Sequence, residues 1–406
     1  MTARDDRFAR LREVYGRAYE RAPACRAIFD GAGLTPDAIH GAAELARIPV
    51  FKKEALLDRQ RADPPFGGFL AEVPSEIARI FISPGPIREP QFRSDRGGHG
   101  FDAVFRAGGV GPGDIVLNTW SYHMVPAGLL LDEGSLAAGA TVVPSGVGQT
   151  ELQAQLVLEL GVTCICASTA FFIALVERIE ATGHVLPRDW KVRSAFLGGE
   201  FGDWMGKRRR LEARYAIRTF SAYATADFGV IGYETADGEG YEIHPDRIVQ
   251  ICDPVSGAPL GPGERGEIVV TTLAPGWPLI RFGTGDAAFA TALATDGTVR
   301  RIGLLQGRVG QAVKAREIFV YPRQVEELVI QTAGVERAQC VIARPAAREE
   351  VTLRLVVAGS VDRPAIDAAA RAKFQDLSRL RADHVEFIAA DALPPDAPLV
   401  VDRKDA

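Results

Sequence analysis

A histidine and a cysteine lie in or beside two apolar stretches that are typical of buried strands. His123 follows DIVLNTW (114–120), and Cys166 lies within VTCICAS (162–168). An imidazole can act as a general base toward a thiol or donate to a thioester carbonyl, and a cysteine can carry an acyl group with that histidine as its base. Each residue also has a plainer interpretation. His123 can be a hydrogen-bonded histidine at a strand end, and Cys166 can be a small core residue. The chemistry that both could serve is general-base or nucleophilic catalysis.

The segments around these residues alternate between strand-like and helix-like patterns from residue 96 to residue 330. Short apolar runs are separated by segments with apolar residues at helical spacing. This alternation predicts a parallel α/β sheet, whose ligands collect at the carboxyl ends of the strands. The predicted strands are 114–120, 140–146, 162–168, 192–199 and 217–223, the helices between them are 126–139, 150–160, 169–183 and 203–215, and an amphipathic helix is predicted at 7–31.

A smaller α+β pattern follows after about residue 305, and it is long enough to form a small core of its own. We therefore predict the fold class as α/β, with a large N-terminal domain of parallel-rich sheets and helices over residues 1–306. A small mobile α+β domain is predicted over residues 307–406. Its predicted elements are the helices 324–332 and 364–380 and the strands 338–345, 350–359 and 384–391.

The composition argues against several classes of protein. Of the 406 residues, 47% are hydrophobic and 24% are charged, the net charge is -5 and no basic stripe is visible, so nucleic acid is not an expected partner. There is no apolar signal region and no run of about 18 apolar residues, so we expect a cytoplasmic protein without a membrane span. The cysteines form no CxxC pair, so neither a disulfide framework nor a zinc site is indicated. They are Cys25, Cys164, Cys166, Cys252 and Cys340.

Three sequence blocks resemble the phenylacetate–coenzyme A ligases, a family of the adenylate-forming acyl-CoA ligase superfamily. The first is GERGEIVVTTLAPGWPLIRFGTGD (263–286), which is similar to "GELVxTTL…xPLIRYRTGD". The second is GRVGQAVKAREIFVYPRQVEELV (307–329), which is similar to "GRxDDMLxxRGxNVFPxQVEExL". The third is the run from Tyr15 to Phe66, whose IPVFKKEAL pattern matches the opening segment of the family. The resemblance spans nearly the whole chain.

The resemblance implies a defined set of parts for handling ATP. A glycine- and threonine-rich loop holds the phosphates through backbone N–H groups and hydroxyls, a glutamate holds magnesium, and a lysine on the small domain stabilises the phosphoryl transition state. The family's loop reads "SSGTTGKP", whereas this chain has SPGPIREP (83–90), in which Ser83 and Gly85 remain. Prolines remove backbone donors there, and Glu89 adds a negative charge where phosphates would lie.

Other parts of the family's site are partly kept. The "YGxTE" motif corresponds to YATAD (223–227), so the magnesium-binding glutamate is replaced by the shorter Asp227. No lysine occurs between Lys373 and Lys404, where the family carries its catalytic lysine. The resemblance implies a nucleotide or CoA role for four kept residues: Asp286 toward the ribose hydroxyls, Gly199 and Glu200 near the adenine, and Arg308 at the hinge.

The resemblance also implies an acyl pocket beside His123. Its aromatic positions suit a flat aryl group or a small acyl group. The expected lining residues are Tyr122, Ser168, Ala170, Phe171, Gly198 and Tyr223.

We consider three functions from these residues. The lost phosphate, magnesium and lysine positions favour ATP-independent transfer of an aryl or acyl group between coenzyme A and another thiol, such as the phosphopantetheine of an acyl carrier protein. The kept Asp286, Glu200 and Arg308 favour instead an ATP-dependent aryl- or acyl-CoA ligase that forms an acyl-adenylate. A third alternative is a non-catalytic protein that binds an acyl ligand. Coenzyme A or an acyl-CoA is the expected ligand, ATP and magnesium belong only to the ligase alternative, and a homodimer is an expectation from the family.

Overall fold

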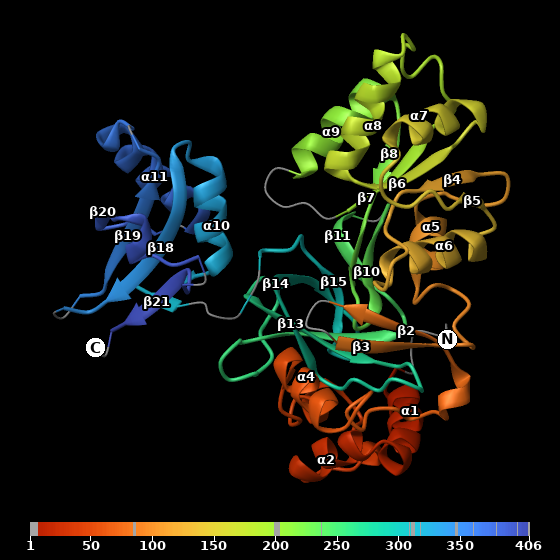
Figure 1. Cartoon of the computed structure of the whole chain (residues 1–406). Coiled ribbons are helices and arrows are strands. Elements are labelled where there is room, and N and C mark those ends of the chain that lie inside the picture. The colour runs from red at the N-terminus through yellow and green to blue at the C-terminus, as the bar shows by residue number, and fades with distance from the viewer. Residues whose placement is uncertain are drawn as a thin grey trace. The chain divides into compact units, whose positions relative to one another are not determined.

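The chain divides into two compact units, which we call the large unit and the small unit (Figure 1). The large unit comprises Met1–Thr284 and Ala288–Leu304, and the small unit comprises Gly285–Ala287 and Leu305–Ala406. That these units correspond to mobile domains at 1–306 and 307–406 stays a prediction. The computed structural model describes residues 7–83, 87–198, 204–236, 238–307, 309, 313–316, 318–345, 348–359, 361–378, 380–395 and 397–404.

A five-stranded parallel sheet forms the first layer of the large unit. Its strands are short hydrophobic runs because helices cover both of their faces. This arrangement confirms the predicted α/β fold class. The strand order is β5 (Thr141–Val143), β4 (Ile115–Asn118), β6 (Cys164–Ser168), β7 (Ser194–Gly198) and β8 (Arg218–Phe220), with α5 (Phe101–Ala107) and α6 (Ala127–Ala137) on one face and α7 (Thr150–Glu159), α8 (Thr169–Ala181) and α9 (Trp204–Tyr215) on the other.

A second sheet of eight strands is largely antiparallel. The two-residue strand β1 (Phe51–Lys52) joins this sheet by pairing in parallel with β14. The other strands lie in the order β12 (Arg247–Cys252), β13 (Arg265–Thr272), β14 (Phe282–Leu293), β15 (Val299–Ile302), β11 (Gly238–Ile243), β10 (Gly229–Thr235) and β9 (Ala222–Thr225).

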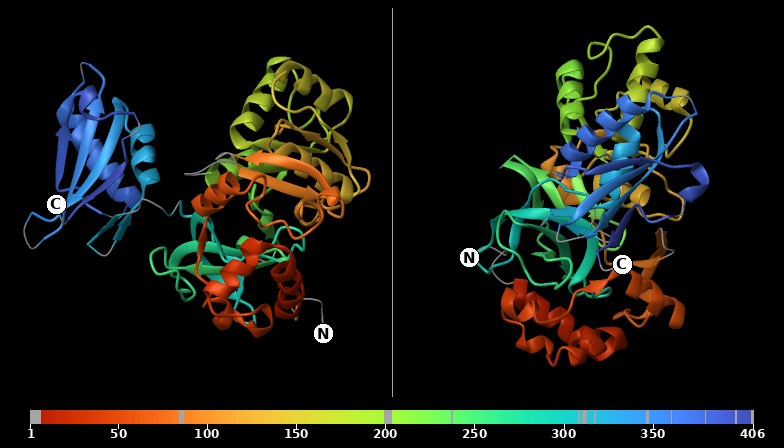
Figure 2. Two further views of the ribbon diagram at one scale, coloured as in Figure 1. Left: turned by 60° about the horizontal axis from the view of Figure 1, so that its bottom comes forward. Right: turned by 90° about the vertical axis from the view of Figure 1, so that its left-hand side faces the viewer.

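The N-terminal helices pack against this second sheet (Figure 2). The predicted single helix over 7–31 is wrong in one respect, because it is interrupted at Ala22, where the backbone is extended (φ -108, ψ 101). Pro23 accounts for the break, since proline disfavours a helical conformation of the preceding residue and lacks an N–H. No helix among the described residues is long and apolar enough to cross a membrane. The helices are α1 (Arg7–Arg21), α2 (Pro23–Gly31), α3 (Ala42–Leu45) and α4 (Lys53–Ala62).

A buried arginine ties the N-terminal segment to the second sheet. Arg281 is 1% exposed and has a left-handed backbone (φ 43). Its guanidinium donates to the carbonyl oxygens of Ala46 (2.6 Å), Gly257 (2.6 Å) and Ile48. The same group lies 3.3 Å from the sulfur of Cys252. These contacts partner both Nη1 and Nη2, whereas Nε is buried without a hydrogen-bond partner.

The small unit is a four-stranded sheet with two helices on its core side. Its strands β18 (Val335–Ala343) and β19 (Glu350–Val357) pair in antiparallel fashion over eight residue pairs. A separate short hairpin, β16 (Val313–Ala315) and β17 (Ile318–Val320), precedes them. The sheet order is β20 (His384–Phe387), β19 (Glu350–Val357), β18 (Val335–Ala343) and β21 (Val400–Arg403), with α10 (Pro322–Gln331) and α11 (Arg363–Ser378).

Candidate functional site

The carboxyl edge of the parallel sheet carries the expected acyl-pocket positions. Tyr122 and His123 follow β4, Ser168 ends β6, Gly198 ends β7, and Tyr223 lies in β9 shortly after β8. Parallel strands place their carboxyl ends on one edge, so the fold brings these five positions to the same side of the sheet. Their role as an acyl pocket stays a prediction.

The hydroxyl of Tyr122 is held by two neighbours. It accepts a hydrogen bond from the Asn118 side-chain amide (2.8 Å) and donates to Asp132 (2.9 Å). Burial, and then the hydrogen bond to Asp132, raise the pKa of Tyr122 well above its usual value. The phenol therefore stays protonated and its ring is fixed in place, which makes Tyr122 a wall of the site and not an acid or base.

Trp120 and Gly198 face each other at the same edge. A Cβ atom added at Gly198 would lie 3.6 Å from the Trp120 ring, in ordinary van der Waals contact. The indole N–H of Trp120 is buried and has no hydrogen-bond partner. The sequence had not singled out Trp120, although an aromatic residue directly after a strand of this sheet was the available signal.

Ser168 has a local structural role. Its hydroxyl accepts a hydrogen bond from the backbone N–H of Phe171 (3.1 Å) and so caps the N-terminus of α8. Ala170 is exposed in the first turn of α8, and Phe171 is partly buried. The three expected residues thus lie together, but the Ser168 hydroxyl is used by the helix.

His123 and Cys166 lie in different surroundings. Cys166 is 0% exposed, and burial raises the pKa of its thiol well above the usual value. His123 is exposed, and its described hydrogen bond is from its backbone N–H to the Ser121 hydroxyl (3.2 Å). A thiol that is shielded from solvent and held protonated is a poor nucleophile. These surroundings suit a small core residue, and the covalent role of Cys166 stays a prediction.

The segment expected to be a phosphate loop is partly a strand. Residues 83–90 were interpreted as a loop, but β3 (Ile87–Phe92) pairs with β2 (Ile77–Ser83) in an antiparallel ribbon. Pro90 is tolerated because a two-stranded ribbon leaves edges where a proline needs no N–H partner. Ser83 and Glu89 are each 2% exposed, and the Ser83 hydroxyl donates to the Glu89 carboxylate (2.5 Å). Gly85 lies outside the described residues.

Glu89 and Asp227 form a buried carboxylate pair, which we call the Glu89–Asp227 pair. Asp227 is 5% exposed and its Oδ2 lies 2.9 Å from Nζ of Lys53, the first residue of α4. Burial, and next the charge of Asp227, raise the pKa of Glu89 to about 8. Glu89 Oε2, Asp227 Oδ1 and the Thr225 hydroxyl are buried atoms without a hydrogen-bond partner. Sequence reasoning missed Lys53, and the only signal was the KK dipeptide in the N-terminal block.

The other nucleotide-region positions are less fully defined. Asp286 lies in β14 and is partly buried. Gly199, Glu200 and Arg308 lie outside the described residues. The expected contact of Asp286 with ribose hydroxyls therefore stays a prediction.

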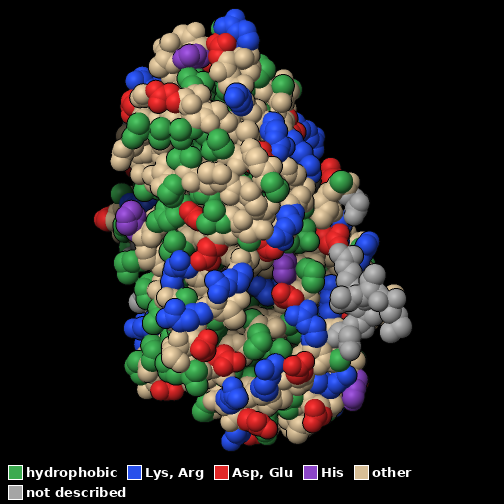
Figure 3. Space-filling model, turned by 90° about the vertical axis from the view of Figure 1, so that its right-hand side faces the viewer, with side chains coloured by type: hydrophobic (Ala, Val, Ile, Leu, Met, Phe, Trp, Pro, Cys, Tyr) green, Lys and Arg blue, Asp and Glu red, His purple; other side chains and the backbone are tan. Residues whose placement is uncertain are grey.

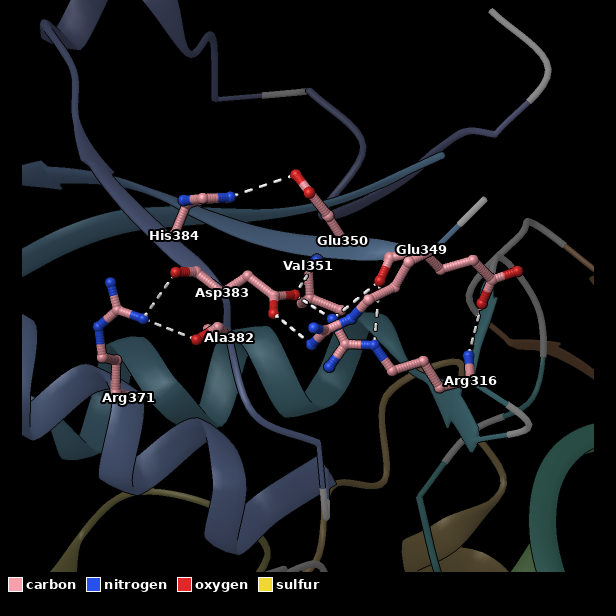
Figure 4. Close-up of polar contacts among 9 residues, drawn as sticks. Arg316, Glu349, Glu350, Val351, Arg371, Ala382, Asp383 and His384 are labelled. Atoms are coloured by element: carbon pink, nitrogen blue, oxygen red, sulfur yellow. Dashed lines mark hydrogen bonds and ion pairs between the residues drawn. The ribbon is translucent and has the colours of Figure 1, made fainter. Parts of the chain in front are cut away.

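Arg316 anchors the turn of the β16–β17 hairpin in the small unit (Figure 4). Its backbone is left-handed (φ 49). The Arg316 backbone N–H donates to the Glu349 carboxylate (2.5 Å), and the guanidinium donates to the Glu349 carbonyl (2.8 and 3.0 Å) and to Asp383. Asp383 also accepts from the backbone N–H of Val351 (2.8 Å). Part of the second family-like block thus forms a hairpin that is tied to the residues just before β19 and β20.

A cavity of about 710 Å³ opens on another part of the large unit, where basic and acidic side chains surround a hollow (Figure 3). It is lined by α1, by residues 90–100 and by the loops around residues 246 and 275. Of the described residues that the sequence singled out for the site, Asp227 alone lines it. The cavity therefore shares Asp227 with the candidate site and is lined by none of the predicted acyl-pocket residues.

A buried histidine in this cavity is expected to make folding stability depend on pH. His244 is 9% exposed, and burial, followed by the charge of Arg247, lowers its pKa to about 4. Asp246, Asp102 and Arg10 are the other charged groups that face it. Since the unfolded histidine has a pKa of about 6.5, the unfolded state binds the extra proton first, and about 3 kcal/mol of stability is lost as the pH falls from about 6.5 to 4.

Urea unfolding at several pH values would measure this loss. His244→Asn keeps an acceptor for the Asp246 N–H, which now bonds Nδ1 of His244 (3.2 Å), and should flatten the slope below pH 6.5. The exposed His40→Asn variant is the control and should behave like the wild type. An equal slope in the His244→Asn and wild-type proteins would show that the histidine carries no such linkage.

Comparison with known proteins first defines the class of the fold. No protein-family model matches the chain. An open conformation of 2-hydroxyisobutyryl-CoA ligase in complex with 2-HIB-AMP and CoA superposes with a TM-score of 0.81 at 24% identity, covering 98% of this chain and 90% of that chain. The fold is that of the adenylate-forming acyl-CoA ligases.

Sequence relatives then define the family. The phenylacetate–coenzyme A ligase of Thermus thermophilus is 31% identical over 364 residues, which cover 86% of this chain and 80% of the relative. The phenylacetate–coenzyme A ligase of Escherichia coli K12 is 30% identical over 336 residues, which cover 79% and 75%. The chain belongs to the phenylacetate–coenzyme A ligase family.

The interpretation as an ATP-independent acyltransferase is wrong. The relatives that match most of the chain are named as phenylacetate–coenzyme A ligases. The transfer to an acyl carrier protein, which belonged to that interpretation, loses its basis. The structure supplies a physical reason for the error: Glu89 does not stand as an open charge, because it is hydrogen-bonded to Ser83 and buried beside Asp227.

Proposed function

We propose that the protein is an ATP-dependent acid–thiol ligase that joins an aryl or acyl carboxylate to coenzyme A through an acyl-adenylate. The observation that carries this proposal is the buried Oδ1 of Asp227, which has no hydrogen-bond partner at the position of the family's metal-binding glutamate. An unpaired buried carboxylate oxygen is costly unless a cation or a donor completes it. The residues present therefore fit a magnesium ion, which would neutralise phosphate charge when bound.

The other residues have roles that follow from their places. Trp120 and Tyr122 would hold a flat acid against the floor formed by Gly198. Asp286 would accept hydrogen bonds from the ribose hydroxyls of the nucleotide. His123, which is exposed beside Tyr122, would take the proton of the incoming thiol.

An assay in two stages tests the proposal. The protein is incubated with Mg·ATP and each of phenylacetate, benzoate, anthranilate and acetate, and acid-dependent exchange of labelled pyrophosphate into ATP reports adenylation alone. Coenzyme A is then added, and the thioester and AMP are measured by mass spectrometry. We expect both signals with at least one aryl acid. The proposal would be overturned if no acid supported pyrophosphate exchange and calorimetry showed no binding of Mg·ATP.

The size of residue 198 is expected to decide which acids are accepted. Because a Cβ at this position would already contact the Trp120 ring, Gly198→Val should fill the space that a flat ring needs. We expect kcat/KM for the best aryl acid to fall by about 10- to 100-fold, the usual range for a few misplaced methyl groups in a pocket.

The ratio of kcat/KM for the aryl acid to that for acetate is the informative measurement. Ala170→Val, an exposed position in the first turn of α8, is the control and should leave the ratio unchanged. A Gly198→Val enzyme with an unaltered ratio would place the acyl group elsewhere.

A further inference from the structure

We propose that Glu89 is a second carboxylate ligand of the divalent cation that accompanies the nucleotide, and that Lys53 neutralises Asp227 until this cation arrives. The proposal rests on the proposed function for the nucleotide. The cation site itself can be tested without it.

The first argument is the set of unused oxygens. Glu89 and Asp227 are 2% and 5% exposed, and each keeps one buried oxygen, Oε2 and Oδ1, without a hydrogen-bond partner. The other oxygen of each is occupied, by the Ser83 hydroxyl at 2.5 Å and by Lys53 Nζ at 2.9 Å. Buried acceptor atoms rarely lack a partner in proteins, because each missing hydrogen bond costs about 1–3 kcal/mol. A hard cation with oxygen ligands would satisfy both at once.

The second argument is the ammonium that already lies there. Lys53 is partly buried, with 29% of its side chain exposed, and it lies against a carboxylate that is almost fully enclosed. Both members of the Glu89–Asp227 pair feel its charge. A lysine is a movable point charge on a flexible stem. It can therefore balance the charge of Asp227 when no metal is bound and withdraw when one binds.

The third argument concerns the length of Asp227. Its carboxylate is one methylene shorter than the glutamate of the family, which shortens its reach toward a cation. Glu89 comes from β3, interacts electrostatically with Asp227 and has the longer side chain. Among the described residues no group of three or more His, Cys, Asp or Glu could hold a metal. Two carboxylates are enough for magnesium, which typically takes one or two from the protein and the rest from phosphates and water.

Manganese binding tests the proposal without relying on turnover. Free Mn²⁺ is followed by electron paramagnetic resonance while MnCl₂ is titrated into the protein, with and without α,β-methylene ATP. With the nucleotide analogue we expect Glu89→Gln to weaken Mn²⁺ binding by about tenfold or more, as expected for loss of one charged ligand, and Asp227→Asn to do the same. Without nucleotide, Lys53→Met should bind Mn²⁺ more tightly than the wild type.

The neighbouring lysine provides a matched control. Lys52 precedes Lys53 and lies 2.5 Å from the buried carboxylate of Glu267, so Lys52→Met removes an equivalent charge outside the Glu89–Asp227 pair and should leave Mn²⁺ affinity unchanged. Thermal unfolding confirms that each variant is folded. Wild-type affinity in a folded Glu89→Gln protein would overturn the proposal.

The two proposals fail in different ways. If the ligase proposal alone is wrong, the nucleotide analogue has no effect, but Lys53→Met still gains Mn²⁺ affinity and Glu89→Gln added to it removes the gain. If the cation proposal alone is wrong, ATP-dependent thioester formation persists, and neither Glu89→Gln nor Lys53→Met changes Mn²⁺ affinity.

Discussion

Replacing Asp286 by alanine is expected to lower ATP-dependent thioester formation by about 100-fold or more. In the proposed ligase its carboxylate accepts hydrogen bonds from the ribose hydroxyls, and a hydrogen bond to a charged group is worth about 1.5–3 kcal/mol. Loss of two such bonds corresponds to a factor of about 100 to 10⁴ in binding and turnover. An ATP-independent acyltransferase would lose little activity on this substitution. The variant therefore also tests the rejection of that interpretation.

The measurement is kcat/KM for ATP with a saturating aryl acid and coenzyme A. Asp376→Ala removes an exposed aspartate from α11 of the small unit and serves as the control. The control should retain wild-type kinetics. An Asp286→Ala enzyme that turns over within a few-fold of the wild type would remove this residue from the nucleotide site.

Arg281→Met is expected to destabilise the protein by about 4 kcal/mol or more. The guanidinium satisfies three backbone carbonyls, those of Ala46, Ile48 and Gly257. Methionine has a similar length and no donors. Each buried carbonyl left unpaired costs about 1–3 kcal/mol, and water has little access because Arg281 is 1% exposed. The lower stability should be accompanied by greater mobility of the N-terminal segment, because the carbonyls of Ala46 and Ile48 lose their hydrogen bonds.

Urea unfolding at neutral pH measures this loss, and hydrogen exchange of residues 42–62 locates it. Arg300→Met, at an exposed position in β15, removes the same charge without a buried contact. Its stability should lie within about 0.5 kcal/mol of the wild type. A stable Arg281→Met protein with protected N-terminal amides would mean that other contacts hold the segment.

The parallel sheet was predictable because its signals are local. Strands such as VTCICAS are continuous apolar runs, since both of their faces are covered, and each is followed by a helix of ordinary length. The small unit was predictable for the same reason, since its strand pair and helices follow one another in the chain. The positions at the carboxyl edge, including Gly198 and Tyr223, follow once the strands are placed.

The Glu89–Asp227 pair was not predictable because its members come from distant parts of the sequence. Glu89 was interpreted as an open charge in a loop, and nothing near it in the sequence shows that it is buried in a ribbon. Its neighbour Asp227 lies in a different sheet region, and Lys53 begins a helix near the N-terminus. The solvation of a carboxylate depends on such long-range neighbours. Departures from a family motif are therefore weak evidence against an activity until the surrounding groups are known.

The short strand β1 has a consequence for the way ligases of this family can be recombined. It pairs in parallel with β14 through Phe51 and Phe282, and Lys53 follows it directly on the way to Asp227. The helical N-terminal segment is therefore not an interchangeable module. A chimera joined between Lys53 and the rest of the chain would combine a lysine from one parent with an aspartate from another. We expect functional hybrids to inherit positions 53, 89 and 227 from the same parent.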